Sequence, residues 1–195
     1  MKKYFFSVAI LATLLFAACG EEPNGDWVEI NGVKWAKCNV DAFGTFALTP
    51  ESFGVFYQWN NPTAWTDTGN VTGWGDIYTG GYNWTAANDP CPKGWRVPTI
   101  QELSYLNEAG SEWTIVNGVN GYLFGSGENT IFLPAAGYIN SYSGFLRDVG
   151  YYGNYWSSTP DGTNAHLLNF QGVDVSPFCT IGFRTGGFSI RCVKE

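Results

Sequence analysis

The sequence contains few charged residues, and few of those are basic. Only 14% of its 195 residues are charged, with 10 Lys and Arg against 17 Asp and Glu, which gives a net charge of −7. Proteins that bind nucleic acid neutralise its phosphates with a patch of Lys and Arg. The sequence has no such patch, so we expect no nucleic-acid partner.

The residue types that build metal and catalytic sites are also scarce. His166 is the single histidine, whereas zinc sites need several clustered His or Cys ligands. Asp and Glu are scattered and form no calcium loop of alternating carboxylates, and no phosphate-binding Gly-rich loop or Gly-x-Ser-x-Gly elbow occurs. We therefore expect no metal, no cofactor and no catalytic residue, and the protein is predicted not to be an enzyme. A nucleophilic pair of His166 with Cys38 or Cys179 is an alternative that these residue types allow.

Aromatic residues and glycine are abundant. Phe, Trp and Tyr make up 17% of the chain, and 25 residues are glycine. Many aromatics, many glycines and few charges favour a compact fold rich in turns and strands over a disordered chain. A chain of this length suits one domain with a substantial core.

The N-terminal segment has the pattern of a targeting signal. Lys2 and Lys3 precede an apolar run from Phe5 to Ala18, which is too short and too close to the N-terminus for an ordinary membrane-spanning helix. The run ends in Leu-Phe-Ala-Ala-Cys, which resembles a bacterial lipobox with Cys19 as the lipidated residue. The resemblance implies cleavage before Cys19 and attachment of acyl chains, which would make the membrane a partner. A plain secretory signal is the alternative.

The targeting pattern defines three segments. We expect a signal peptide at residues 1–18, a lipidated cysteine with a polar tether at 19–25, and one domain at 26–195. Glu21 and Glu22 directly follow Cys19, and such an acidic pair resembles the surface-export signal of Bacteroidetes lipoproteins. The alternative is a solvated linker. The expected location is the outer membrane, with the domain lipid-anchored and exposed at the cell surface.

One helix is predicted after a proline-rich segment. Thr99 has the position of an N-cap, and Glu102 lies three residues later, which is the spacing of a capping box. Leu103 and Leu106 fall on one face, as a half-buried helix requires. Gly110 is suited to end the helix.

Short strands are expected on both sides of this helix. Asn31-Gly32 lies between Trp27–Ile30 and Val33–Val40 and predicts a hairpin, because both turn positions need positive φ. Asn117-Gly118 and Asn120-Gly121 also favour tight turns. Further strand candidates are Gly54–Trp59, Trp113–Val116, Tyr122–Gly125, Thr130–Pro134, Tyr155–Ser158, Ala165–Phe170 and Phe188–Val193.

A long loop separates the first strands from the helix. Residues 60–89 are rich in Gly, Thr, Asn and Trp and show no hydrophobic period. Loops of this length within one domain are often functional. Its aromatic residues Trp65, Trp74, Tyr82 and Trp84 are candidates for ligand binding, because such side chains stack on ligands and carry much binding energy.

Six signature blocks occur along the chain. They are Trp35-Ala36 with Asn39-Val40, Gly54 with Tyr57-Gln58-Trp59, Asp89–Thr99, Phe132–Gly137, Gly153–Thr159 and Ser189–Val193. In order and spacing they resemble the Fibrobacter succinogenes major paralogous domain. That family is similar to the C-type-lectin-like superfamily, with its formylglycine-generating enzymes and the variable proteins of diversity-generating retroelements. The resemblance implies an α+β C-type-lectin-like fold, with one main helix, short irregular antiparallel strands and long loops.

The resemblance also implies a disulfide. In the lectin-like pattern a bridge joins the start of the helix to the last strand, which here implies Cys91–Cys192. Cys38 and Cys179 could form a second pair or remain two buried free thiols. Formylglycine-generating enzymes use two cysteines close together near the C-terminus, and the spacing of Cys179 and Cys192 departs from that pattern.

A second set of ligand-binding candidates comes from the variable proteins. Their ligand face lies between the Trp-Ser-Ser-Thr block and the Cys-Val end. The corresponding candidates in this sequence are Tyr152, Asn154, Asn164, His166, Asn169 and Asp174. Ordinary strand surface is the alternative interpretation of these residues.

Together these patterns predict a surface-exposed lipoprotein with a noncatalytic domain that binds a glycan or a protein without an evident calcium site. One alternative is a structural or accessory subunit of a cell-surface appendage or complex. A formylglycine-generating type of enzyme is a further alternative, against which the missing cysteine pair argues.

Overall fold

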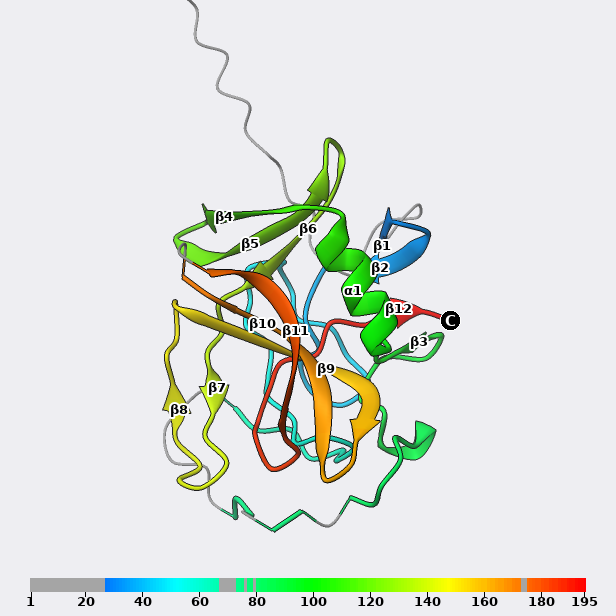
Figure 1. The fold of residues 1–195 in the computed structure, drawn as a ribbon, viewed down its shortest axis with the longest axis vertical. Helices are drawn as coiled ribbons and strands as arrows, with labels where there is room; N and C mark the ends of the chain where they lie inside the picture. The colour runs from blue at the N-terminus through cyan, green and yellow to red at the C-terminus, as the bar shows by residue number, and fades with distance from the viewer. Residues whose placement is uncertain (1–26, 67–72, 76, 79, 173–174) are drawn as a thin grey trace, which may run out of the picture.

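The domain is built mainly from β-strands (Figure 1). The computed structural model describes residues 27–66, 73–75, 77–78, 80–172 and 175–195. Within these ranges the elements are β1 (Trp27–Ile30), β2 (Val33–Ala36), the 3-10 helix η1 (Ala86–Asn88), β3 (Trp95–Arg96), α1 (Ile100–Glu108), β4 (Ser111–Val116), β5 (Val119–Ser126), β6 (Asn129–Pro134), β7 (Tyr138–Ile139), β8 (Leu146–Arg147), β9 (Tyr152–Asp161), β10 (Asn164–Gln171), β11 (Val175–Phe183) and β12 (Val193–Lys194).

The expected α+β C-type-lectin-like fold is wrong. The described residues form four small antiparallel sheets, and α1, with nine residues, is the single α-helix among them. The reason lies in the segments between the turns, which are rich in aromatic and β-branched side chains that favour strands. Neighbouring segments joined by tight turns pair with each other, so the chain forms successive hairpins.

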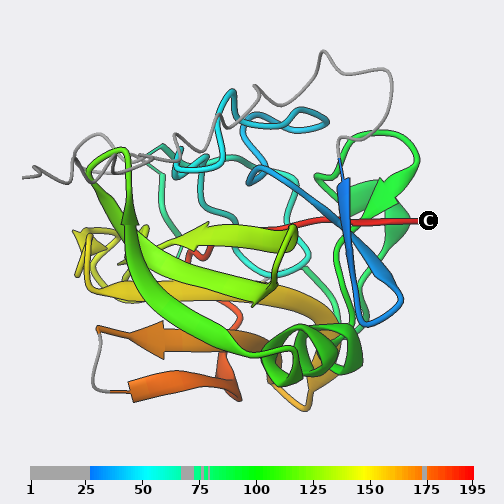
Figure 2. The same cartoon turned by 90° about the horizontal axis from the view of Figure 1, so that it is seen from above.

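The four sheets connect distant parts of the chain. The first has the order β1-β2-β12-β3, so both ends of the described domain lie in one sheet. The second and third are the three-stranded sheets β4-β5-β6 and β11-β10-β9, and the fourth is the hairpin β7-β8. Seen from above, the second and third sheets lie one over the other, and α1 lies at one end of them (Figure 2).

Two of the three predicted turns are confirmed. Asn31 and Gly32 have φ of 49° and 79°, and Asn117 and Gly118 have φ of 48° and 84°, as tight hairpin turns require. The predicted turn at Asn120-Gly121 is wrong, since both residues lie within β5 and pair with β4. The turn at Asn117-Gly118 already reverses the chain, so the residues after it must run back along β4.

The predicted helix is confirmed together with its cap. The Thr99 side chain accepts a hydrogen bond from the N–H of Glu102, and the Glu102 carboxylate accepts one from the N–H of Thr99 at 2.8 Å. Leu103 and Leu106 are fully buried. The helix ends at Glu108, two residues before Gly110, whose φ of 89° suits the reversal after a helix.

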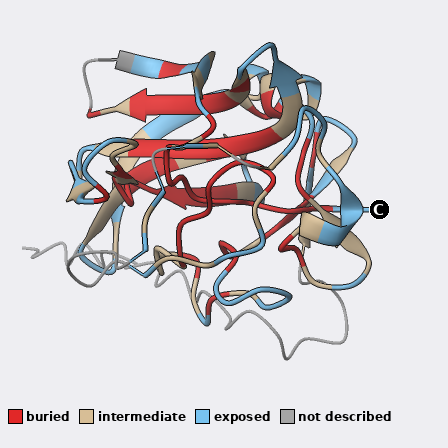
Figure 3. Ribbon diagram, turned by 90° about the horizontal axis from the view of Figure 1, so that it is seen from below, coloured by how far each residue is buried: buried red, intermediate tan, exposed pale blue. Residues whose placement is uncertain are grey.

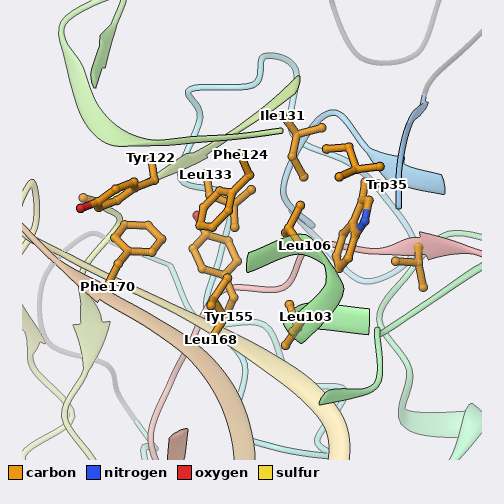
Figure 4. Packing of buried hydrophobic residues seen from close by; sticks show 13 residues of the cluster. Trp35, Leu103, Leu106, Tyr122, Phe124, Ile131, Leu133, Tyr155, Leu168 and Phe170 are labelled. Atoms are coloured by element: carbon orange, nitrogen blue, oxygen red, sulfur yellow. The ribbon is translucent and has the colours of Figure 1, made fainter. Parts of the chain in front are cut away.

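The main core is a set of aromatic rings between the second and third sheets. Phe170 on β10 contacts Tyr122 and Phe124 on β5 at ring-centre distances of 5.2 and 6.3 Å, and stacks on Tyr155 at 6.0 Å. Figure 4 shows these rings packed together, with the leucines of α1 beside them. Burial follows the central strands, whereas many of the loops are exposed (Figure 3).

The predicted strands between residues 113 and 170 are confirmed, because each lies within β4, β5, β6, β9 or β10. The predictions for residues 175–195 are less accurate. β11 was not among the strand candidates. Phe188–Val193 was expected as a strand, but β12 begins only at Val193, and of the rest only Phe188 and Ser189 form isolated bridges. Gly54–Trp59 likewise forms isolated bridges at Phe56 and Tyr57.

Candidate functional site

The described part of the long loop lies at one end of the molecule, near the turn between β9 and β10 (Figure 1). Asn60, at the start of this loop, is fully buried and binds its later part. The Nδ2 group of Asn60 donates to the carbonyl oxygens of Gly80 and Asn83, and its Oδ1 accepts from the N–H of Thr85 at 2.8 Å. One buried amide thus holds the loop across 25 residues.

Arg184 joins the loop to the β9–β10 turn. Its guanidinium donates to the carbonyl oxygens of Gly81 and Tyr82 in the loop at 2.7 and 3.2 Å. It also donates to those of Gly162 and Asn164 at 2.8 Å each. Arg184 is only 2% exposed, so a buried cation is satisfied by carbonyl oxygens from two segments and holds both in place.

A cavity of about 320 Å³ lies above this arginine. It is lined by Tyr78, Gly81, Tyr82, Thr163 and Arg184. The Tyr82 side chain is 78% exposed, whereas the guanidinium of Arg184 lies 5.3 Å from the ring centre of Tyr78. The cavity is therefore lined both by the buried, hydrogen-bonded Arg184 and by the exposed aromatic side chain of Tyr82.

The segment from Tyr82, which lines this cavity, to Trp84 leads to a second cavity of about 420 Å³. Trp84 and Trp95 both line it, and both are half-buried. The Trp84 ring also meets the buried Trp59 edge-on at 5.4 Å, and Trp59 stacks under Arg184 at 4.1 Å. We call the surface formed by the two cavities and the segment between them the loop face.

The signature blocks form the scaffold beneath the loop face. Nε1 of Trp59 donates to the carbonyl oxygen of Ser157, and Nε1 of Trp156 donates to that of Tyr57, each at 2.8 Å. These reciprocal bonds join two blocks that lie about 100 residues apart in the sequence. A third block is tied in at Pro98, whose carbonyl oxygen accepts from the N–H of Ser158 at 2.7 Å.

A family model described as the Fibrobacter succinogenes major domain matches residues 28–194. The chain belongs to this family. No curated protein and no solved structure matches the chain. The signature blocks of the Fibrobacter succinogenes major domain are largely buried and bonded to one another, so they account for much of its fold.

Four candidates came from the long loop, and the structure divides them. Trp65 and Trp74 meet each other edge-on at 5.4 Å and pack against a small core cluster, and Nε1 of Trp74 donates to the carbonyl oxygen of Ser141 at 3.1 Å. These two tryptophans hold the loop on the domain and lie outside the loop face. Tyr82 and Trp84 do line its cavities.

The candidates on the strands do not form one site. Tyr152, Asn154 and Asn169 lie at neighbouring positions of β9 and β10, and Nδ2 of Asn169 donates to Oδ1 of Asn154 at 2.8 Å. Both asparagines are largely buried, so their amides mainly serve each other.

The other strand candidates lie elsewhere on β10 or beyond the described residues. Asn164 is at the opposite end of β10, where its carbonyl oxygen accepts from Arg184. His166 is half-buried and pairs with Ile181 across the sheet. Asp174 lies outside the described residues. The structure therefore does not gather these residues into a single face.

The disulfide implied by the resemblance is present. Cys91, just before α1, is bonded to Cys192, just before β12, and the two residues are 101 positions apart. The second pair is not formed, because Cys179 carries a free thiol. Cys179 packs half-buried beside α1, and burial together with the negative charge of Glu108 raises the pKa of its thiol.

Sequence reasoning missed several residues of the loop face. Trp95, which lies in a signature block, and Tyr78, Thr163 and Arg184 were not among the predicted ligand-binding residues. The arginine had one usable signal, since it stands among glycines and aromatics in a chain with 10 basic residues. Among the residues that the structure describes, no three His, Cys, Asp or Glu side chains gather as a metal site, and no helix is long and apolar enough to cross a membrane.

Proposed function

We propose that this member of the Fibrobacter succinogenes major domain family is a lipoprotein exposed at the cell surface, and that its domain binds a glycan or protein ligand without catalysis. The lipobox-like end of the apolar N-terminal run at Cys19 supports the lipid anchor. The acidic pair after Cys19 supports exposure at the surface of the outer membrane.

The loop face supports the binding role. The two ends of one loop segment, Tyr82 and Trp84, line cavities of about 320 and 420 Å³, and these sizes fall within the range of ligand pockets. Asn60 and Arg184 hold that segment and its neighbours through hydrogen bonds to residues 81, 82, 83 and 85. A ligand would meet a largely preformed surface, so little binding energy is lost in ordering the loop.

Direct binding tests this proposal. The mature domain without Cys19 would be screened on glycan and extracellular-matrix arrays, with and without calcium. We expect reproducible hits that do not need calcium and that weaken at least tenfold in Tyr82→Ala. Tyr142→Ala is the matched control, because Tyr142 is equally exposed (76% against 78%) but lies in the β7–β8 loop. A blank screen with folded protein, or equal losses in both variants, would contradict this role for the loop face.

Lipidation and location need their own test. In cells, replacement of Cys19 by Ala should prevent incorporation of labelled fatty acid and release the protein from the membrane fraction. Protease added to intact cells should digest the wild-type domain. Protection from protease would contradict surface exposure, and unchanged fatty-acid labelling of the variant would contradict the anchor.

An accessory subunit of a surface complex is the second candidate. The edge strand β11 supports it, because its nine residues carry no charge and Phe178, Ile181 and Phe183 on it are exposed. Uncharged edge strands with apolar side chains are prone to pair with other chains. Stable copurification with other envelope proteins, combined with no glycan or matrix binding, would favour this candidate.

A further inference from the structure

We propose that the 420 Å³ cavity between Trp84 and Trp95 binds a neutral sugar ring of a glycan. This inference rests on the proposed binding function and names the ligand class for one cavity of the loop face. Aromatic walls suit a pyranose ring, because its flat C–H faces are apolar and its rim carries hydroxyl groups. Ligand pockets of this kind combine apolar lining with a few polar groups that set orientation.

Both aromatic walls are held before any ligand arrives. The Asp89 carboxylate accepts three hydrogen bonds, from Nε1 of Trp84 at 3.1 Å and from the N–H groups of Cys91 and Val97 at 3.0 Å each. The other indole, that of Trp95, meets the ring of Phe46 edge-on at 5.3 Å. The two indole rings are thus fixed in position. A ligand in the cavity would contact the part of each ring that remains exposed.

The same hydrogen bonds limit what the cavity can do chemically. The Asp89 oxygens are already occupied by protein donors, so this carboxylate is poorly placed to coordinate calcium or to accept protons from a ligand. Arg96 is likewise engaged, because its guanidinium binds both carboxylate oxygens of Glu102 at 2.6 and 2.8 Å. The exposed Lys93 and the Glu195 carboxylate are the charged side chains left to meet hydroxyl groups.

The balance of charge favours a neutral ligand. The charged side chains left free in the cavity are one cation, Lys93, and one carboxylate, Glu195. A uronic acid or sulfated sugar would be attracted to Lys93 and repelled by Glu195. A hydroxyl group can accept a hydrogen bond from the ammonium of Lys93 and can donate one to the carboxylate of Glu195. An uncharged sugar ring can therefore bind both the positive and the negative side chain.

The test fills the cavity without disturbing the core. Ala86 lies exposed on η1 and lines the cavity, so Ala86→Gln places a longer side chain there. Ala87→Gln is the matched control, because Ala87 is the next exposed residue of η1 and does not line it. Lys93→Ala, also at an exposed position, provides a second variant. The probes are neutral gluco-, manno- and galacto-oligosaccharides, and oligogalacturonate of equal length, measured by calorimetry after thermal melts confirm folding.

The expected result is binding of at least one neutral oligosaccharide, at least tenfold weaker in Ala86→Gln, several-fold weaker in Lys93→Ala and unchanged in Ala87→Gln. Binding that survives Ala86→Gln but is lost in Tyr82→Ala would overturn this inference and leave the proposed function standing. Preference for oligogalacturonate over the neutral sugars, or binding of proteins but not glycans, would also overturn this inference and leave the proposed function standing. If wild-type protein binds neither glycan nor protein, the proposed function itself fails.

Discussion

Arg191 donates from Nε to Oδ1 of Asn39 at 3.0 Å, although 152 residues separate them and both are fully buried. The same guanidinium donates to the carbonyl oxygens of Ala36 and Phe132 at 3.1 and 2.9 Å. Burial lowers the pKa of Arg191 to about 10. A buried cation satisfied by oxygens from two segments, residues 36–39 and Phe132, thus joins the end of the domain to its beginning.

This relationship predicts a large loss of stability when Asn39 is changed. Asn39→Leu leaves the buried guanidinium short of an acceptor and also removes the bond from Nδ2 of Asn39 to the carbonyl oxygen of Phe53. We expect the free energy of unfolding in urea to fall by about 2–4 kcal/mol. Ile190→Val, at an equally buried neighbour of Arg191, should cost only about 1 kcal/mol. Equal losses in the two variants would show that the bond to Arg191 contributes little.

Gly54 is predicted to tolerate no side chain. It has φ of 66°, and a Cβ there would collide with the backbone carbonyl of Val40. Gly127, in the β5–β6 turn, has a similar φ of 62° but open space around it. Gly127→Ala should cost about 1–2 kcal/mol from backbone strain alone, and Gly54→Ala should cost clearly more in the same urea titration. Matching losses would mean that the backbone around Val40 moves aside easily.

The helix cap makes stability depend on pH. Burial alone would raise the pKa of Glu102, but hydrogen bonds from Arg96 and Thr99 outweigh it and hold the pKa below its usual 4.5. The carboxylate therefore stabilises the fold above the unfolded-state pKa, and this contribution disappears as pH falls through the lower folded-state value. The gap in unfolding free energy between wild type and Glu102→Gln should be widest at neutral pH.

That gap should shrink as the pH is lowered below about 4.5. Urea titrations between pH 7 and about pH 3 measure it. Glu112→Gln, at an exposed position on β4, controls for the loss of one negative charge. A gap for Glu102→Gln that stays constant over this range would argue against the cap as its source.

The disulfide should contribute a large share of the stability. Cys91 and Cys192 close a loop of 101 residues, and the chain-entropy model assigns such a loop about 4–5 kcal/mol. The double variant Cys91→Ala/Cys192→Ala should lose that amount in urea unfolding, and cavity formation can add to it. Cys179→Ala, which removes a free thiol, is the control and should change stability much less. Wild-type stability in the double variant would contradict the entropic contribution.

Local signals in the sequence were sufficient for the helix and the hairpins. The cap of α1 depends on Thr99 and Glu102, which are three residues apart, and the first turn depends on the adjacent pair Asn31-Gly32. Such contacts form within a few residues, so their chemistry can be inferred from the order of residue types. The signature blocks likewise identified the family, although the fold class inferred from its relatives was wrong.

The candidate site was only partly predictable. Tyr82 and Trp74 are both aromatic residues of the same loop, yet the first is exposed and the second packs against a core cluster. Nothing in their local sequence separates these outcomes, because burial depends on what the rest of the chain places against each ring.

The sequence by itself determined where the helix begins, where the first hairpin turns and to which family the chain belongs, since each depends on residue types at short or characteristic spacing. Only the tertiary structure decided the loop face. Arg184 binds carbonyl oxygens of residues 81, 82, 162 and 164, which lie up to 103 positions away from it. Carbonyl oxygens belong to every residue, so no side-chain pattern marks them as partners before the fold brings them together.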